Sequence, residues 1–253
     1  MKKAIQITGL KELPVLKDIT MEIEENQFIT ISGSNNSGKT TLMRILNRDI
    51  IVTDSIEVEK KRIEEYSISD YTNFVQAVFP MEIIWNGETV EEELEYAPKN
   101  HKEEIMKGLH IKRFLSKEIT SLSKEETILL QMAIALLKNP KILLLDNIGP
   151  YLGDYKYKVL LFLKKYQKNH KITILYTTLD LEDSLSSDYL YILSDGMVVL
   201  EGNPMDVLQQ DNLIHKIGLK VPFMIDLSVK LKDYDLIERI ETDPERLVDV
   251  LWK

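Results

Sequence analysis

Residues 33–40, Gly-Ser-Asn-Asn-Ser-Gly-Lys-Thr, have the types and spacing needed to bind a polyphosphate. They satisfy the pattern G-x-x-x-x-G-K-[ST], in which glycines let successive backbone N–H groups turn inward around a phosphate. The lysine of this pattern faces the β- and γ-phosphates, and the hydroxyl that follows it ligates Mg²⁺. We therefore predict a site for ATP and Mg²⁺. The residues predicted to form it are Gly33, Ser34, Asn35, Asn36, Ser37, Gly38, Lys39, Thr40 and Thr41.

The sequence on both sides of this phosphate loop (residues 33–41) predicts the elements that must position it. Residues 27–32 form an apolar run typical of a buried strand, and residues 39–47 favour a helix. The N-terminus of that helix would add the positive end of its dipole to the phosphate site. An ordinary glycine turn is the alternative interpretation, and the flanking strand and helix make it the less favoured one.

A second anchor for the metal is predicted at Asp146. Residues 141–145, Lys-Ile-Leu-Leu-Leu, form an apolar run that ends in this acid. Such a run is typical of a strand that lies inside a parallel sheet and is buried on both faces. A carboxylate at its end would bind Mg²⁺ together with the Thr40 hydroxyl, as the Walker B aspartate of a P-loop NTPase does.

The other predicted elements indicate an α/β protein with a mostly parallel core sheet. Residues 4–8 and 20–23 alternate like antiparallel strands with one exposed face. A helix is expected at 152–168, a buried strand at 172–177, and a hairpin around Asp195–Gly196.

Two further stretches of the chain favour helices. Residues 89–139 are rich in Glu and Lys, and after residue 204 the composition again becomes helical. Asp243 before Pro244 is a clear helix start. We therefore expect one domain at 1–204 with a helical subdomain at about 89–139, and a small C-terminal helical extension at 205–253.

The composition excludes several functions. The chain of 253 residues has 41 acidic and 32 basic residues, a formal net charge of −9, which argues against nucleic acid as a partner. The absence of cysteine excludes disulfides and thiolate metal sites. The histidines show no ligand spacing and are interpreted as ordinary surface or half-buried residues. They are His101, His110, His170 and His215.

No apolar run approaches the roughly 20 residues that span a bilayer. The N-terminal residues 1–6, Met-Lys-Lys-Ala-Ile-Gln, become polar too early for a signal peptide. The sequence therefore predicts a cytoplasmic protein.

Together these features resemble the ATP-binding subunits of ABC transporters, most closely those of energy-coupling-factor vitamin and metal importers. The resemblance covers nearly the whole chain and implies an ABC-type P-loop NTPase fold with an N-terminal antiparallel β part. It also implies that Gln76 is the Q-loop glutamine, a further metal ligand. The segments similar to family segments are Val15–Ile19, Thr89–Leu94 with Pro98–Asn100 (TVEEDVAFGPEN), Asn139–Asp146 (RPKILLLDE), Glu201–Pro204 (EGTP) and Gly218–Phe223.

The chain departs from the family at its signature. In the family two nucleotide domains meet head to tail, and the LSGGQ signature of one binds the γ-phosphate of the ATP held by the other. Here both glycines are absent, and Ser123, Lys124 and Glu125 are the signature-equivalent residues. Ser123 and Glu126 instead match a capping box, so a plain capped helix is an equally good interpretation. Each glutamate would repel a phosphate charge at about 5 Å by about 3 kcal/mol, partly offset by Lys124.

The catalytic positions differ as well. The glutamate expected after the Walker B aspartate is Asn147, the switch histidine is Leu179, and the D-loop aspartate is Gly153. The aromatic residue that stacks on adenine is missing because the segment at 10–13 is short. Asparagine cannot accept a proton, and general-base assistance is worth about 10²–10⁴-fold in rate. The sequence therefore predicts ATP binding with little or no hydrolysis at the chain's own site.

The resemblance implies two partners. A homodimer would contain two identical damaged sites, so a heterodimer with an intact ABC ATPase paralogue is favoured. The other partner is a membrane-embedded transporter subunit, which would hold this chain on the inner face of the cell membrane. The alternatives are a non-hydrolysing ATP-dependent scaffold or regulator, and an ABC protein unrelated to transport, such as an iron–sulphur assembly ATPase.

A candidate seat for the membrane subunit follows the expected Q-loop. Residues 79–85, Phe-Pro-Met-Glu-Ile-Ile-Trp, are densely apolar, and an acidic run follows them. Buried core and a solvated helix face are the alternative interpretations. The acids of the run are Glu88, Glu91, Glu92, Glu93 and Glu95.

Overall fold

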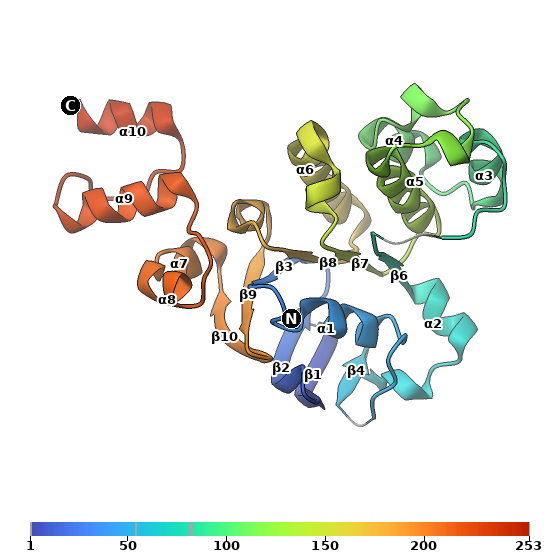
Figure 1. Cartoon of the computed structure of the whole chain (residues 1–253), viewed down its shortest axis with the longest axis horizontal. Coiled ribbons are helices and arrows are strands. Elements are labelled where there is room, and N and C mark those ends of the chain that lie inside the picture. The colour runs from blue at the N-terminus through green and yellow to red at the C-terminus, as the bar shows by residue number, and fades with distance from the viewer. Residues whose placement is uncertain (1, 54, 81–82, 253) are drawn as a thin grey trace.

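A mixed sheet of ten strands organises the protein in the computed structural model, which describes residues 2–53, 55–80 and 83–252 (Figure 1). The strand order is β5-β4-β1-β2-β10-β9-β3-β8-β7-β6. The strands are β1 (Lys3–Glu12), β2 (Leu16–Glu24), β3 (Phe28–Gly33), β4 (Ile56–Val58), β5 (Lys61–Arg62), β6 (Val75–Val78), β7 (Ile142–Asp146), β8 (Thr173–Thr178), β9 (Tyr189–Ser194) and β10 (Met197–Gly202). The helices are α1 (Lys39–Leu46), α2 (Ile68–Phe74), α3 (Val90–Tyr96), α4 (Lys102–Gly108), α5 (Lys124–Leu137), α6 (Lys156–His170), α7 (Pro204–Leu208), α8 (Asp211–Lys216), α9 (Phe223–Asp233) and α10 (Pro244–Leu251).

The part of the sheet that carries the phosphate loop is parallel. Strand β3 pairs in parallel with β8 and β9, and β7 pairs in parallel with β6 and β8. The carboxyl ends of these strands therefore meet at one edge, where ligands of α/β sheets bind. The expected α/β class with a mostly parallel core is confirmed.

The other part of the sheet is antiparallel, as residues 4–8 and 20–23 predicted. Strand β1 pairs with β2 and with β4, and β9 and β10 form the expected hairpin. Strands β4, β5 and β6, which are two to four residues long, are not among the elements predicted from the sequence. Strands this short carry too few alternating positions to give a periodic signal.

Helices cover both faces of the parallel strands, which explains their continuous apolar sequences. Along β7, Leu143 and Leu145 pack in a core shared with α5 and α6. Ile142 and Leu144 pack on the other face with residues of α1. Each face of the strand is thus removed from water, as the unbroken run at 141–145 predicted.

The helical stretches lie at opposite ends of the molecule. Figure 1 shows α3, α4 and α5 together at one end and α9 and α10 at the other. Helix α6 begins at Lys156 rather than at 152, because residues 149–155 form two 3₁₀ turns first. The predicted start of the last helix is confirmed: the Asp243 side chain caps α10 by accepting from the Glu245 and Arg246 N–H groups.

The C-terminal helices pack on the sheet through a third apolar cluster. Ile214, Leu219 and Ile225 contact a group that includes Leu190 and Ile192 of β9. The extension is therefore joined to the sheet by buried side chains, while the division at residue 205 stays a prediction. Among the described residues, none of the helices combines the length and the apolar character that crossing a bilayer requires.

Candidate functional site

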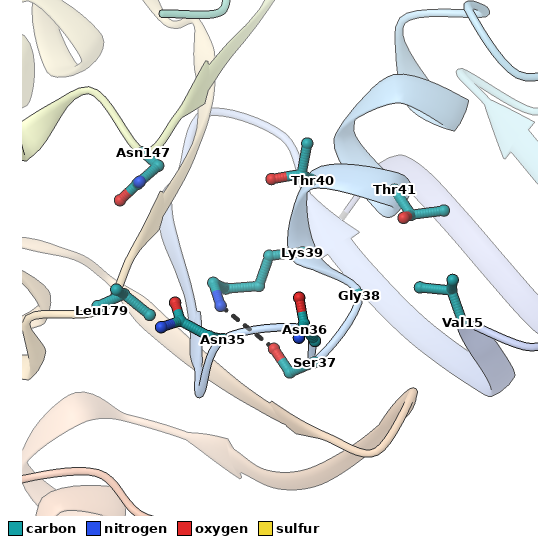
Figure 2. Close-up of a pocket in the computed structure, with 10 residues that line it drawn as sticks. All are labelled: Val15, Asn35, Asn36, Ser37, Gly38, Lys39, Thr40, Thr41, Asn147 and Leu179. Atoms are coloured by element: carbon teal, nitrogen blue, oxygen red, sulfur yellow. Dashed lines mark hydrogen bonds between the residues drawn. The ribbon is translucent and has the colours of Figure 1, made fainter.

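The phosphate loop forms one wall of a cavity of about 400 Å³ at the carboxyl edge of the parallel strands (Figure 2). This phosphate cavity contains predicted binding residues together with the two altered catalytic positions, Asn147 and Leu179. Those two line the side opposite Val15 and Thr41. Its lining residues are Val15, Asn35, Asn36, Ser37, Gly38, Lys39, Thr40, Thr41, Asn147 and Leu179.

The two glycines of the motif are required by the backbone of the loop. Gly38 precedes α1 with φ 102°, and a Cβ there would lie 2.3 Å from Leu16 Cδ2. A Cβ on Gly33 would lie 2.2 Å from the carbonyl oxygen of Leu193. Only glycine fits at such positions, so the loop can turn tightly from β3 into α1. The turn places the first N–H groups of α1 at the cavity, where they are available to an anion.

Lys39 is held inside the loop by the loop's own oxygens. Its Nζ donates to the carbonyl oxygens of Gly33 (2.7 Å) and Ser34 (2.9 Å) and to Ser37 Oγ (3.2 Å). Desolvation by burial lowers the pKa of Lys39 to about 8, although the nearby Asp146 carboxylate raises it. The ammonium group is therefore positioned and poorly solvated, so a phosphate oxygen that reaches it gains a strong charge-assisted hydrogen bond.

The residues predicted to hold Mg²⁺ meet at the ends of β7 and α1. Thr40 Oγ1 donates to Asp146 Oδ2 at 2.9 Å, and Thr177 Oγ1 donates to Asp146 Oδ1 at 2.6 Å. A hydroxyl and a carboxylate in direct contact form the oxygen donor set that a hard cation prefers, and Mg²⁺ takes one or two protein oxygens besides phosphates and waters. Thr40 and Asp146 fit such an ion. It would supply charge neutralisation of the β- and γ-phosphates.

Gln76 does not lie with these residues. It is inside β6, where it pairs with Leu143, three positions before Asp146 along the neighbouring strand β7. Its side-chain amide donates to the carbonyl oxygens of Thr72 and Val75. Strand β6 continues to Val78, so the chain leaves the sheet only after Gln76, and the structure does not bring this residue to the phosphate cavity.

Asn147 adopts a conformation that favours asparagine. Its φ is +48°, a left-handed value that Asn tolerates better than most residues. Its backbone N–H donates to the carbonyl oxygen (3.1 Å) and to Oγ1 (2.9 Å) of Thr177. Its Oδ1 is buried and has no hydrogen-bond partner among the described residues. A neutral amide oxygen can accept a hydrogen bond but does not take up a proton, so Asn147 can orient a water but cannot act as a base.

Leu179 follows β8 and is 40% exposed. Beside it, Asp183 accepts hydrogen bonds from Tyr176 and Thr178, each at 2.8 Å, and pairs with Lys156 at 2.8 Å. The buried Asp183 carboxylate is thus engaged by three partners. The side chain that reaches the phosphate cavity from this turn is the apolar Leu179, which can neither donate nor accept a proton.

The signature-equivalent segment forms hydrogen bonds within itself. Ser123 Oγ accepts from the Glu126 N–H (3.2 Å), and Glu126 Oε2 accepts from the Ser123 N–H (3.0 Å), which completes the expected capping box. Glu125 pairs with Arg113, and Glu126 pairs with Lys117 at 2.8 Å. The cations that balance the glutamates are therefore Arg113 and Lys117 and not Lys124, the cation expected from the sequence.

These contacts set the charge of the segment. Burial raises the pKa of the Glu126 carboxyl, but the Lys117 ammonium and the Ser123 N–H lower it further, so that the pKa lies below its ordinary value. The carboxylate is therefore ionised at neutral pH. The N–H groups of Ser123 and Glu126, the residues on either side of the two replaced glycine positions, are used here by the chain's own side chains.

Replacing Ser123 with alanine is expected to destabilise the protein by about 1 kcal/mol, because α5 loses its N-cap. In a protein of this size that is a fall of about 2–4 °C in the melting temperature. Ser123→Asn keeps a capping side chain and Lys124→Ala alters an exposed neighbour, so both should stay close to wild type. Thermal unfolding measures all three, and a Ser123→Ala protein as stable as wild type would show that the box contributes nothing.

Two residues of the site were not predicted from the sequence. Val15 lines the phosphate cavity, and Thr177 fixes the Asp146 carboxylate. Val15 lies just before β2 and close to the segment at 10–13, in which the adenine-stacking aromatic residue is missing. Its place in the sequence was therefore the one signal that could have indicated a role in the site. Thr177 gave none, because a threonine in a buried strand is ordinary β sequence.

Comparisons with known proteins agree with this geometry. The profile of the family described as ABC transporter matches residues 16–148, just over half of the chain. The chain is 26% identical to the energy-coupling factor transporter ATP-binding protein EcfA1 of Lactobacillus gasseri, over 95% of this chain and 90% of that protein. A similar solved structure, cbiO1 from Clostridium perfringens, described as part of the ABC transporter complex cbiONQ, has a TM-score of 0.73 and 22% identity, covering 92% of this chain and 100% of that one.

A dimeric post-hydrolysis structure of the ATP-binding cassette MJ0796, bound to ADP and Pi, has a TM-score of 0.65 and 22% identity, covering 80% of this chain and 97% of that one. These likenesses establish the fold as that of an ABC cassette. The family profile spans the stretch from the start of β2, through the phosphate loop, to just past Asp146. This chain therefore belongs to the ABC transporter family, whose ATP-binding domains bind ATP with Mg²⁺.

Proposed function

We propose that this chain is the ATP-binding subunit of an energy-coupling-factor-type ABC importer and that it holds ATP without hydrolysing it efficiently. The observation that carries the proposal is the content of the phosphate cavity. Lys39 and Thr40, which bind phosphate and metal, face the same space as Asn147 and Leu179, which cannot transfer a proton. Compared with the family pattern, the cavity keeps the groups that bind ATP and lacks the groups that would catalyse its hydrolysis. The names of the relatives support the transporter assignment.

The form of the signature supports a heterodimer. In a head-to-tail dimer the segment at Ser123 would face the ATP of the other subunit, and here that segment is capped by Glu126 and carries two glutamates. A homodimer would place this segment against both ATP molecules. Pairing with a second ABC ATPase that has intact catalytic groups leaves one composite site with its base, while this chain acts as an ATP-dependent clamp.

Copurification from native membranes tests the assignment. We expect the chain to bring with it a second ABC ATPase and a membrane-embedded subunit, which would place it peripherally on the cytoplasmic face. A chain recovered with an ABC partner but never with a membrane subunit would support the second candidate, an ATP-dependent scaffold or regulator. The self-capped signature is the observation that favours that candidate.

A groove beside β6 is the proposed seat for the membrane subunit. A cavity of about 180 Å³ lies between β6 and α5, lined by Phe79 and Ile83 on one side and by Ile134 on the other. Next to it the Ile84 side chain is 97% exposed and that of the adjacent Ile83 is 41% exposed. Apolar anchors of this kind supply affinity at an interface.

Of the other residues predicted to contact the membrane subunit, some are buried in the protein and some are exposed. Trp85 is half-buried and packs against the main core, as the alternative interpretation had it. Glu93 is buried and accepts from the Asn86 and Gly87 N–H groups, so it holds the turn before α3. Met81 and Glu82 lie outside the described residues. The acids of the run that remain exposed are Glu88, Glu91, Glu92 and Glu95.

Ile84→Ser combined with Glu92→Lys is expected to weaken copurification of the membrane subunit about tenfold or more, because one buried aliphatic side chain alone contributes about 1.5–3 kcal/mol. ATP affinity should not change, since neither residue lines the phosphate cavity. The matched control is Ile51→Ser with Glu57→Lys, an exposed pair near β4. Pull-down from detergent-solubilised membranes measures the effect, and equal recovery of the partner by both double variants would place the seat elsewhere.

A further inference from the structure

Three side chains from two distant segments meet where α4 packs against the end of α6. His101 precedes α4, Glu104 lies in its first turn, and His170 is the last residue of α6. The ligating atoms of the three residues all lie within 4.8 Å of one another. The Nε2 of His170 is 2.8 Å from Glu104 Oε2, and the two imidazole centroids are 4.1 Å apart. Two of the four histidines that showed no ligand spacing in the sequence, His101 and His170, are thus neighbours in space.

The surroundings hold this cluster in place. Tyr166, one turn before His170 on α6, is fully buried, and its ring lies 4.1 Å from the His170 ring and 6.3 Å from the His101 ring. The His170 side chain is 15% exposed and that of Glu104 is 37% exposed. His101 is exposed, which leaves a path from solvent. The cluster is therefore partly desolvated and accessible, as a metal site must be.

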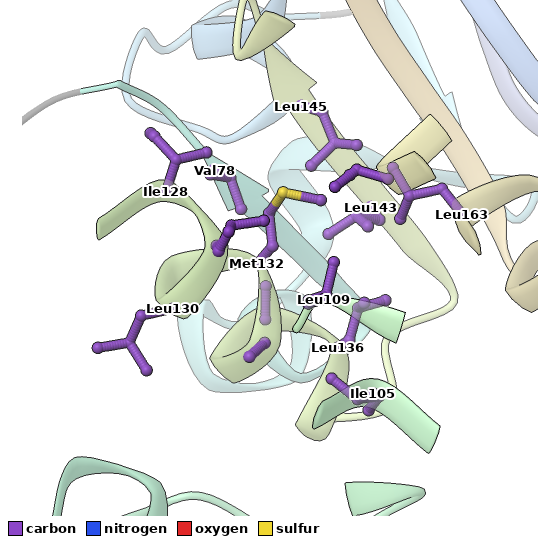
Figure 3. Packing of buried hydrophobic residues seen from close by; sticks show 14 of the residues in the cluster. Val78, Ile105, Leu109, Ile128, Leu130, Met132, Leu136, Leu143, Leu145 and Leu163 are labelled. Atoms are coloured by element: carbon purple, nitrogen blue, oxygen red, sulfur yellow. The ribbon is translucent and has the colours of Figure 1, made fainter. Parts of the chain in front are cut away.

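The helices behind the cluster are firmly packed. Ile105 and Leu109, next to Glu104 on α4 and at its end, are buried in the core with Leu163 of α6 (Figure 3). The backbone that carries the three ligands is thus anchored before any ion binds. A site built on packed helices needs only small side-chain adjustments to reach a coordination geometry.

We propose that His101, Glu104 and His170 form a binding site for a divalent transition-metal cation of the Zn²⁺ type. Two imidazole nitrogens and one carboxylate oxygen are a donor set that Zn²⁺ accepts, with water in the fourth position. Tetrahedral ligands at 2.0–2.1 Å from the metal are about 3.3 Å apart, so the ligand atoms must move by little more than 1 Å. The metal would take the place of the hydrogen bond between His170 Nε2 and Glu104 Oε2. Imidazole ligands disfavour Mg²⁺.

The proposed site is separate from the phosphate cavity. His170 comes just before the N-terminal end of β8, whereas Leu179 and the cavity follow its C-terminal end. Six strand residues at about 3.3 Å each separate the two by about 20 Å. Metal bound here would tie α4 of the helical insertion to α6. Its presence or absence is independent of whether the chain binds ATP.

The test is a Zn²⁺ titration of the untagged full-length chain in excess Mg²⁺ and without nucleotide. We expect one Zn²⁺ per chain, and His101→Gln or His170→Gln should weaken binding at least about 100-fold, since even outer partners of metal ligands are worth 10–100-fold. His215→Gln, which alters an exposed histidine on α8, should bind like wild type. Co²⁺ in place of Zn²⁺ should give the visible absorption of a four-coordinate nitrogen and oxygen site in wild type and in His215→Gln, but not in His101→Gln or His170→Gln.

Glu104→Gln separates a metal site from a plain hydrogen bond. Glutamine can still accept from or donate to His170, so a purely structural contact survives, whereas a neutral amide is a poor zinc ligand. We expect Zn²⁺ to raise the melting temperature of wild type and not that of Glu104→Gln. Zinc binding that is equally tight in all the variants, or absent from wild type at micromolar concentration, would overturn the proposal.

Discussion

Lys39→Ala is expected to abolish ATP binding, with a loss of affinity of about 10²–10⁴-fold. The ammonium group is positioned by Gly33, Ser34 and Ser37 inside a cavity that offers few other cations to the β- and γ-phosphates. A hydrogen bond to a charged group is worth about 1.5–3 kcal/mol, and Lys39 would make two of them. Every 1.4 kcal/mol is tenfold in affinity, which gives the expected range.

Equilibrium binding of a labelled ATP analogue in the presence of Mg²⁺ measures this loss. Asn147→Ala is the matched control, because it alters another residue of the same cavity that makes no charged contact, and its affinity should stay near that of wild type. Thermal unfolding of both variants checks that each is folded, so that a loss of affinity can be assigned to the phosphate loop. Undiminished affinity in the Lys39 variant would mean that ATP binds elsewhere on the chain.

The phosphate loop and its flanking elements could be predicted because local sequence determines them. Gly33 and Gly38 are required by positive φ and by the close approach of Leu193 and Leu16, and β3 and β7 are buried along their whole length because both of their faces are covered. The capping box at Ser123 and the helix start at Asp243 are equally local. The capping box and the helix start each involve residues within four positions of one another, so both can be recognised without a structure.

Features that depend on pairing between distant segments could not be predicted. In the pairing of β6 with β7, Gln76 lies opposite Leu143, three residues before Asp146. No residue near Gln76 in the sequence indicates this pairing. Arg113 and Lys117 balance Glu125 and Glu126 from a preceding turn. Such contacts arise only when the helical insertion folds back on α5.

The His101–Glu104–His170 cluster shows the same limit most clearly. His101 and Glu104 lie within one turn, which by itself is common in helices, and His170 is on another helix. Only the packing of α4 against α6 joins them. Composition argued correctly that thiolate sites are excluded, yet it said nothing about imidazole sites that tertiary structure assembles.

The purified chain is expected to hydrolyse ATP at or near the uncatalysed background. A general base is worth about 10²–10⁴-fold, and neither Asn147 nor Leu179 can serve as one. The carboxylates that lie near the cavity are already engaged: Asp146 by two threonine hydroxyls, and Asp183 by Tyr176, Thr178 and Lys156. Robust turnover that disappears in Lys39→Ala would show that another group acts as the base.

Restoring both catalytic positions tests the second half of the argument. Asn147→Glu with Leu179→His should leave hydrolysis low in the isolated chain and raise it about 10²-fold or more only when a partner with an intact signature is added. The reason is the capped Ser123 segment, which presents two ion-paired glutamates to the ATP of a second copy. Glutamate at φ +48° also costs about 1–2 kcal/mol of stability, so folding is checked first. Turnover of the double variant alone equal to that with the partner would mean that the signature segment is competent as it stands.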